Sequence, residues 1–201
     1  MALKLITPPE TLPITLTEAK AQLAVDFNDH DDLIRLLMGA AVGYCDGPEG
    51  FLERALVDQT WDVVLDGFPN NEIRIPLPPL IEVVGVFYDD GAGNEQSVAP
   101  DAYTVDSANE PGWVLPTSPG SWPSTFSGIN SVRVRFRAGY VDNSTSPATG
   151  KVPDDLKQAI LLYVGTLYAQ RETVVVGNIV QAVPWSAEQL LRRKKIGLSL
   201  A

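Results

Sequence analysis

SVRVRFRA, residues 131–138, alternates strictly between polar and apolar side chains. Successive side chains of a β-strand point to opposite faces of its sheet, so this alternation predicts a half-buried strand. Its even-numbered positions are expected to face a core. Its odd-numbered positions would place three guanidinium groups, those of Arg133, Arg135 and Arg137, together on the opposite face.

Further strand signals lie on the N-terminal side of this stretch. Residues 89–94, DDGAGN, have the composition of a tight hairpin turn, and residues 110–130 are rich in Pro, Gly and Ser. β-Branched or alternating runs predict strands at residues 60–66, 72–75, 81–88 and 102–106. Together these signals predict a β-rich region from about residue 58 to residue 141.

Helical patterns flank the β-rich region on both sides. A capping-box pattern at Thr15 and Glu18 predicts a short helix that ends near Val25. A second apolar face at helical spacing predicts a helix over residues 28–45. Helical spacing returns at Pro153, whose fixed φ suits the first turn of a helix, and it continues to about residue 171.

The C-terminal residues carry two further patterns. Residues 173–183, TVVVGNIVQAV, are apolar and β-branched, which predicts an extended arm or a hairpin. Ser186 can cap a last short helix over residues 187–195. The predicted fold class is therefore α+β: a small helical bundle with a β-rich insertion and a C-terminal extended arm plus short helix. The expected segments are residues 1–57, 58–141, 142–172 and 173–201.

Composition and charge narrow the class of protein. Of the 201 residues, 45% are hydrophobic and 20% are charged, as in ordinary folded domains. We find no signal segment and no run approaching the roughly 20 apolar residues of a membrane span, so we expect no membrane partner. The net charge is −10; residues 1–70 carry −8 and residues 153–201 carry +2. This balance argues against a protein that coats nucleic acid, which needs cationic surface, and permits head-to-tail contact between subunits.

Residues that could carry catalysis or hold a metal are few. His30 is the only histidine and Cys45 the only cysteine, whereas a catalytic triad or a zinc site needs several such side chains. We therefore expect no enzyme activity, no cofactor and no metal. A carbohydrate-binding or hydrolytic β module is the less favoured alternative, because aromatic residues in β regions more often fill a core. Its candidate platform residues are Trp61, Trp113 and Trp122.

The sequence contains two basic clusters whose binding partners it does not determine. Arg133, Arg135 and Arg137 could touch phosphates, pair with acidic groups across a subunit boundary, or remain solvated. Residues 192–195, RRKK, have two possible roles. They either stabilise the last helix, because cations interact favourably with the negative end of its dipole, or dock on an acidic partner surface.

Several short motifs, each weak alone, follow one another in a characteristic order. They are LTEAKAQL (16–23) before an Asp-rich helix start, RAL (54–56), QTW (59–61), LDGFP (65–69), IPLPPL (75–80), the turn after Tyr88, VRFRAGY (134–140), VP (152–153) leading into LKQAILL (156–162), and RE (171–172). In this order the chain resembles the head-tail connector, or adaptor, proteins of long-tailed double-stranded DNA phages and of gene transfer agents. The resemblance spans nearly the whole chain.

This resemblance implies a structural ring of subunits, usually dodecameric, in the neck of a virion or gene-transfer-agent particle. The ring would sit beneath the portal protein, join the DNA-filled head to a stopper or tail-terminator protein, and let double-stranded DNA pass without specific binding. Such a subunit would be made in the bacterial cytoplasm and can be monomeric before it assembles. Another neck component, a stopper or tail-completion protein, is the alternative.

The resemblance also implies that the C-terminal segment engages the portal. We expect residues 185–201 to be loosely held in the free subunit and to order on the portal; the alternative is packing on the chain's own bundle. The expected portal-docking residues are Trp185, Leu190, Leu191, Arg192, Arg193, Lys194 and Lys195. We expect the helices, and not the β insertion, to form the centre of the ring contact. The expected contact residues are Leu33, Leu37, Leu156 and Tyr163, together with Arg133, Arg135 and Arg137.

Overall fold

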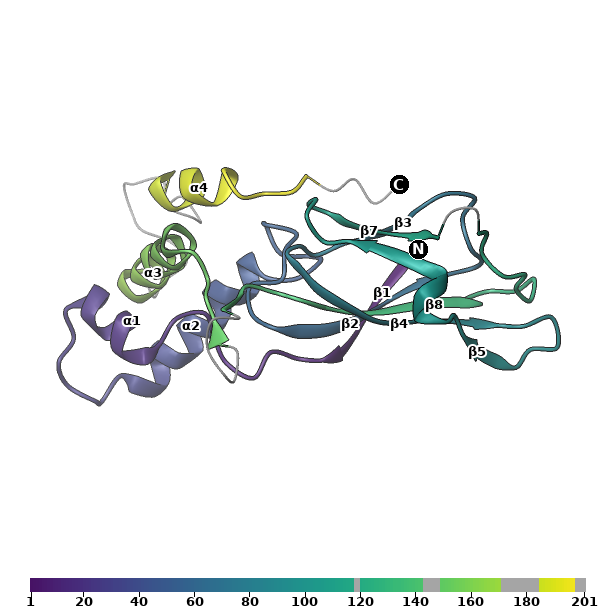
Figure 1. Ribbon diagram of the computed structural model, residues 1–201. Coiled ribbons are helices and arrows are strands. Elements are labelled where there is room, and N and C mark those ends of the chain that lie inside the picture. Colours follow the sequence, from purple (N-terminus) through teal and green to yellow (C-terminus); the bar gives the residue numbers. More distant parts are fainter. Residues whose placement is uncertain (118–119, 143–148, 171–184, 198–201) are drawn as a thin grey trace.

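Helices and sheets occupy opposite ends of the molecule (Figure 1). The computed structural model describes residues 1–117, 120–142, 149–170 and 185–197. Its helices gather at one end, and two antiparallel sheets form a β body at the other. Each part has a separate apolar core. The mixed α+β class that the sequence predicts is confirmed.

The helical part consists of α1 (Leu16–Leu23), α2 (Asp31–Cys45), α3 (Asp154–Ala169) and α4 (Trp185–Arg192). The predicted capping box of α1 is confirmed. Thr15 Oγ1 accepts the Glu18 N–H at 3.2 Å, and the Glu18 carboxylate accepts the Thr15 N–H at 2.6 Å. α3 packs against each of the other three helices and therefore lies at the centre of this part.

The β body consists of two sheets that share one core. The larger sheet has the order β1–β2–β8–β4–β5 and the smaller has the order β3–β7–β6. The larger contains β1 (Ala2–Thr7), β2 (Gln59–Leu65), β8 (Val132–Ala138), β4 (Leu80–Asp89) and β5 (Glu95–Ser97). The smaller contains β3 (Ile73–Ile75), β7 (Gly112–Pro116) and β6 (Tyr103–Asp106), the last preceded by a 3-10 turn at Pro100–Ala102. A two-stranded pair, β9 (Val141–Asp142) and β10 (Thr149–Gly150), follows β8.

β8 is the central strand of the larger sheet. It pairs with β2 on one side and with β4 on the other, both antiparallel. Val132, Val134 and Phe136 are completely buried, and the last two belong to the core shared with the smaller sheet, whereas the intervening arginines lie on the outer face. The alternation in the sequence therefore predicts both the strand and its two faces correctly.

The edge strand β1 was not predicted from the sequence. β1 forms an edge of the larger sheet and lies within residues 1–57, the segment expected to be helical. It pairs with β2, so that Leu3 lies opposite Val63 and Lys4 opposite Asp62. The N-terminal residues therefore belong to the β body, and the helices α1 and α2 follow them along the chain. The predicted arm at residues 173–183 lies outside the residues that the structure describes.

A polar joint connects the two parts of the molecule. Asp46 follows the last residue of α2, and its Oδ1 accepts the backbone N–H of Leu56 at 2.6 Å. The two carboxylate oxygens of Asp46 also accept from Gln59 Nε2 at 3.1 Å, and Gln59 in turn accepts the indole N–H of Trp61 at 3.1 Å. Burial raises the pKa of Asp46, while its hydrogen bonds oppose the rise. The joint holds the end of α2 against the start of β2.

Candidate functional site

The arginines of β8 form a row of ion pairs across the outer face of the larger sheet. The Arg135 guanidinium bridges both carboxylate oxygens of Asp62 on β2, at 2.8 and 2.9 Å. Asp62 is only 1% exposed although it lies on this outer face, because the arginines of the neighbouring strand cover it. The hydrogen bonds to Asp62 raise the pKa of Arg135, so its guanidinium stays charged.

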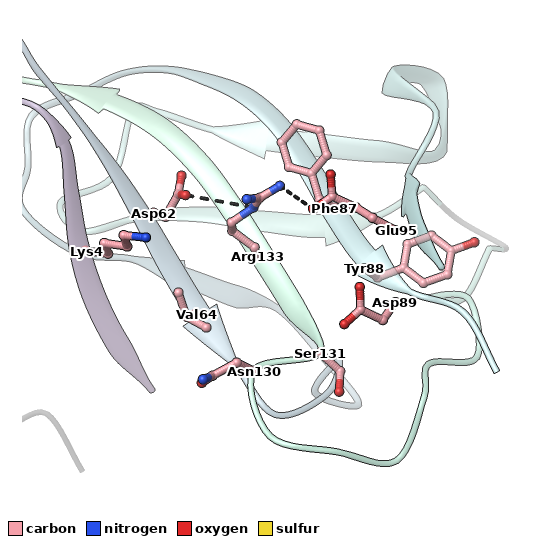
Figure 2. A pocket seen from close by; sticks show the side chains of 10 residues that line it. All are labelled: Lys4, Asp62, Val64, Phe87, Tyr88, Asp89, Glu95, Asn130, Ser131 and Arg133. Atoms are coloured by element: carbon pink, nitrogen blue, oxygen red, sulfur yellow. Dashed lines mark hydrogen bonds and ion pairs between the residues drawn. The ribbon is translucent and has the colours of Figure 1, made fainter. Parts of the chain in front are cut away.

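Arg133 lies at one end of the row, beside an open hollow of about 290 Å³ (Figure 2). Its guanidinium donates to Glu95 on β5 at 2.7 Å and lies 4.7 Å from the centre of the Phe87 ring. Its Nε is 3.8 Å from Asp62 Oδ2, too long for a hydrogen bond but close enough for electrostatic attraction. Lys4 from the edge strand lines the same hollow.

Arg137 lies at the other end of the row, near the helical part. It donates to Glu82 on β4 at 2.5 Å and to both oxygens of Asp58, which directly precedes β2. The hydrogen bonds to Asp58, and then those to Glu82, raise the pKa of Arg137. The complete row holds three guanidinium groups and four carboxylates, all from one chain. A partner phosphate would have to displace these carboxylates.

Within the chain, the arginine row has carboxylate partners for every guanidinium group. The sequence left phosphate contact, pairing across a subunit boundary and solvation as choices. In the structure all three arginines pair with carboxylates of β2, β4, β5 and the residue before β2. The expected subunit-contact role of the row is untested and stays a prediction.

The C-terminal helix places its predicted docking residues on two different sides. Leu191 is completely buried in the helical core, and Leu190 is partly buried against the same core. On the outer side, Trp185 is 66% exposed and Arg193 is exposed as well. Arg192 is also exposed and pairs with Glu188 one turn earlier, at 2.6 Å.

The residues just after α4 are attached to the body. The Lys194 carbonyl accepts from Arg54 Nε at 2.5 Å, and the Ile196 N–H donates to the Leu52 carbonyl at 3.2 Å. The ammonium groups of Lys194 and Lys195 lie 3.9 Å from Asp155 and 3.7 Å from Glu53, respectively. In this structure Leu190 and Leu191 pack on the chain's own bundle, as the alternative interpretation expects, whereas Trp185 stays exposed. Docking of this segment on the portal stays a prediction.

The predicted ring-contact residues of the helices fill the chain's own core to different degrees. Leu156 is completely buried and cannot reach a neighbour in this conformation. Leu37 and Tyr163 pack partly against the same core, and Leu33 is half-buried. The exposed apolar side chain of α2 is instead Leu36, at 70% exposure. Helical spacing alone marks all these positions as apolar and does not tell which of them face outward.

Residues with catalytic potential are engaged in structural contacts. His30 Nδ1 lies 2.6 Å from the hydroxyl of Tyr168 and its ring packs edge-on against Phe27. Cys45 is completely buried, and this burial raises the pKa of its thiol to about 12. The Asp90 carboxylate closes the β4–β5 turn by accepting the N–H groups of Ala92 and Asn94. No group of three or more His, Cys, Asp or Glu residues suited to a metal occurs in the described ranges.

The three tryptophans considered for carbohydrate binding occupy different settings. Trp61 is 7% exposed and belongs to the β core. Trp113 is half-buried beside the Arg74 guanidinium, and Trp122 stacks on Phe68 with 4.7 Å between ring centres. Trp61 therefore cannot contribute to a sugar platform while the body is folded. None of the described helices combines the length and apolar character of a membrane span.

The structure thus defines an α+β chain whose distinctive surfaces are a charge-balanced sheet face and exposed helix faces.

No protein-family model and no curated protein sequence matches the chain. Solved structures share its fold over nearly the full length of both chains. A chain of the virion of a native gene transfer agent (GTA) particle aligns with a TM-score of 0.74 and 21% identity, covering 97% of this chain and 95% of that chain.

Two further matches come from structures of a particle neck. A chain in the neck of an empty GTA particle, computed with C6 symmetry, aligns with a TM-score of 0.73 and 22% identity. A chain in the neck of a native GTA particle, computed with C12 symmetry, aligns with a TM-score of 0.70 and 23% identity. Both alignments cover 97% of this chain and 95% of the other. At these identities the likeness shows that the fold is shared.

Proposed function

We propose that this chain is a structural subunit of a head-tail connector ring in the neck of a gene-transfer-agent or tailed-phage particle. The observation that carries the proposal is the full-length structural likeness to chains from two particle necks, with TM-scores of 0.73 and 0.70. Both the helical part and the β body take part in the alignment, because it covers 97% of the chain. The likeness agrees with the resemblance that the sequence motifs show independently.

A ring is supported by the symmetry of the necks that contain the similar chains. One was computed with C6 symmetry and the other with C12 symmetry, and a dodecamer is compatible with both. In the proposed position the neighbours of the ring are the portal on one side and a stopper or tail-terminator protein on the other. Docking of residues 185–201 on the portal stays a prediction.

The electrostatics of the chain suit a channel through which DNA passes. The net charge is −10, and the arginine row is matched by carboxylates of the same chain. Binding to duplex DNA is dominated by cationic groups that release counterions from the phosphates. A surface whose cations are already paired would not hold the passing DNA.

Removing the chain from a particle-producing cell tests the proposed function. We expect DNA-filled heads and separate tails, with joined particles restored by supplying the wild-type chain, because the ring is the bridge between them. Electron microscopy of the purified particles counts the three forms. Normal numbers of joined particles without the chain would overturn the proposal.

The same particles separate the connector from its closest alternative. A tag on the chain that maps to a ring touching the portal supports the connector. A ring that touches only the tail side would instead identify a stopper or tail-completion protein.

A further inference from the structure

The outer face of α2 is an apolar surface that the chain itself leaves uncovered. Ile34, Met38 and Ala41 point into the helical core. The exposed positions, which recur at helical spacing on the other side, are Asp32, Arg35, Leu36, Gly39, Ala40 and Gly43. Leu36 is 70% exposed, and a flat region of small residues follows it toward the C-terminal end of the helix.

The two glycines on this face are not explained by the folded chain. A Cβ atom added to Gly39 or Gly43 would meet nothing within 4 Å, and neither residue has a positive φ. Each nevertheless costs about 1 kcal/mol of helix stability relative to alanine. Glycine at an open helix position becomes useful when another element approaches closely, because the missing side chain shortens the distance between the two backbones.

The outer face of α4 has the complementary shape and charge. Ala187 and Leu191 anchor α4 to the core, and Trp185, Gln189, Arg192 and Arg193 line its exposed side. Trp185 presents a large aromatic side chain of the kind that dominates protein interfaces. Arg193 forms no ion pair with any residue in the described part of the chain.

The two faces match in spacing. Asp32 and Ala40 are eight positions apart on α2, about 12 Å along the helix, and Trp185 and Arg193 are also eight positions apart, Arg193 directly following the last residue of α4. In an antiparallel arrangement Trp185 would lie on the small residues around Ala40, and Arg193 would meet Asp32. Leu36 would then lie opposite Gln189, at the middle of the contact.

The Asp32 carboxylate is accessible for this contact. It pairs with Arg35 on its own helix at 2.8 Å, through one of its two oxygens, and its side chain is fully exposed. Ion pairs between exposed side chains one turn apart contribute little to stability. A second guanidinium, that of Arg193, can therefore join or replace Arg35 at small cost.

These faces cannot meet within one chain, because each turns away from the core that α2 and α4 share. We propose that the outer face of α4 docks on the outer face of α2 of a second copy of this chain. The contact joins two different patches, and repeated contacts of this kind close into a ring when the rotation between subunits permits. This inference rests on the proposed ring and names the surfaces that build it.

A cysteine pair at the centre of the contact tests this arrangement. The variant carries Leu36→Cys and Gln189→Cys in one chain; Cys45 does not interfere because it is completely buried. Particles produced with this variant and then oxidised should yield a ladder of disulfide-linked copies on a non-reducing gel. The control, Leu36→Cys with Ser97→Cys, places the second cysteine at an exposed site of the β body and should yield no ladder.

A charge exchange tests the same contact without a covalent bond. Asp32→Arg and Arg193→Asp should each weaken the ring contact by about tenfold, because a like-charge pair replaces an attractive one. The double variant should recover most of the loss. The readout is the number of particles in which heads and tails are joined.

The outcomes separate this inference from the proposed function. A ladder and charge recovery support the α4–α2 contact. A chain that is present in joined particles but forms no ladder overturns the contact and leaves the connector role standing. A link between the thiol introduced by Gln189→Cys and the portal would likewise overturn the α4–α2 contact and leave the connector role standing. If the chain is absent from the particles, both the α4–α2 contact and the connector role are overturned.

Discussion

Asp62 shows how a single residue organises the outer face of the sheet. A buried carboxylate is costly unless it is paired and hydrogen-bonded, and Asp62, at 1% exposure, receives two bonds from Arg135 and attraction from Arg133. The pair joins the neighbouring strands β2 and β8. It therefore balances the charge of Arg135 and stabilises the sheet at the same time.

The pair predicts an asymmetry between single and double substitutions. Arg135→Leu should lower the free energy of unfolding by about 2 kcal/mol, since it leaves the Asp62 carboxylate buried without its main partner. Adding Asp62→Leu should restore much of this loss, because two apolar side chains replace the ion pair at no desolvation cost. Urea unfolding of the wild-type chain, the two single variants and the double variant measures both effects. A double variant as unstable as the sum of the singles would contradict this account.

Individual elements differ in how clearly the sequence encodes them. The capping box of α1 and the alternation of β8 are local patterns, and both elements form where they are expected. β1 has no such pattern: residues 2–6 read ALKLI, which alternates poorly, and the strand exists only because β2 lies beside it. Its stability comes from pairing with residues about sixty positions away, which no local signal records.

The partners of the arginine row could not be predicted from the sequence for the same reason. Asp62 is 73 positions from Arg135, and Glu82 is 55 positions from Arg137. The alternation places the arginines on one face but does not show which strands lie beside them. Likewise, the apolar spacing of α2 marks Leu36 and Leu37 alike, although only the position of the core decides that Leu36 is the more exposed.

Helix α4 carries a prediction about the free subunit. Leu191→Ala should lower the free energy of unfolding by about 2–4 kcal/mol, because Leu191 is completely buried in the helical core and its truncation leaves a cavity. Trp185→Ala is the matched control: the side chain is 66% exposed, and we expect little change. Thermal or urea unfolding of the isolated chain gives both values. Equal, negligible effects would show instead that α4 is loosely held before assembly, as the sequence first indicated.

The whole molecule combines two cores with different tasks in the proposed ring. The helical core leaves the outer faces of α2 and α4 for contacts between copies, and the β core supports a broad sheet face on which opposite charges are paired. Arg54 also links the parts, since it donates to the Lys194 carbonyl and to Glu110 of the β body. A shared fold over 97% of the chain is expected if both parts are needed together.

Pairing of the arginine row leads to a prediction for DNA. The wild-type chain should show no retention of duplex DNA at about 0.15 M salt, because its arginine row is balanced and its net charge is −10. The double variant Asp58→Asn and Glu82→Gln frees Arg137 from both carboxylates and should bind DNA weakly, with an affinity that falls as salt rises. The control Glu49→Gln with Glu72→Gln changes the net charge equally at two exposed positions and should not bind. Fluorescence anisotropy of a labelled duplex measures all three proteins. Equal binding by both double variants would show that net charge, and not the paired row, keeps the surface from holding DNA.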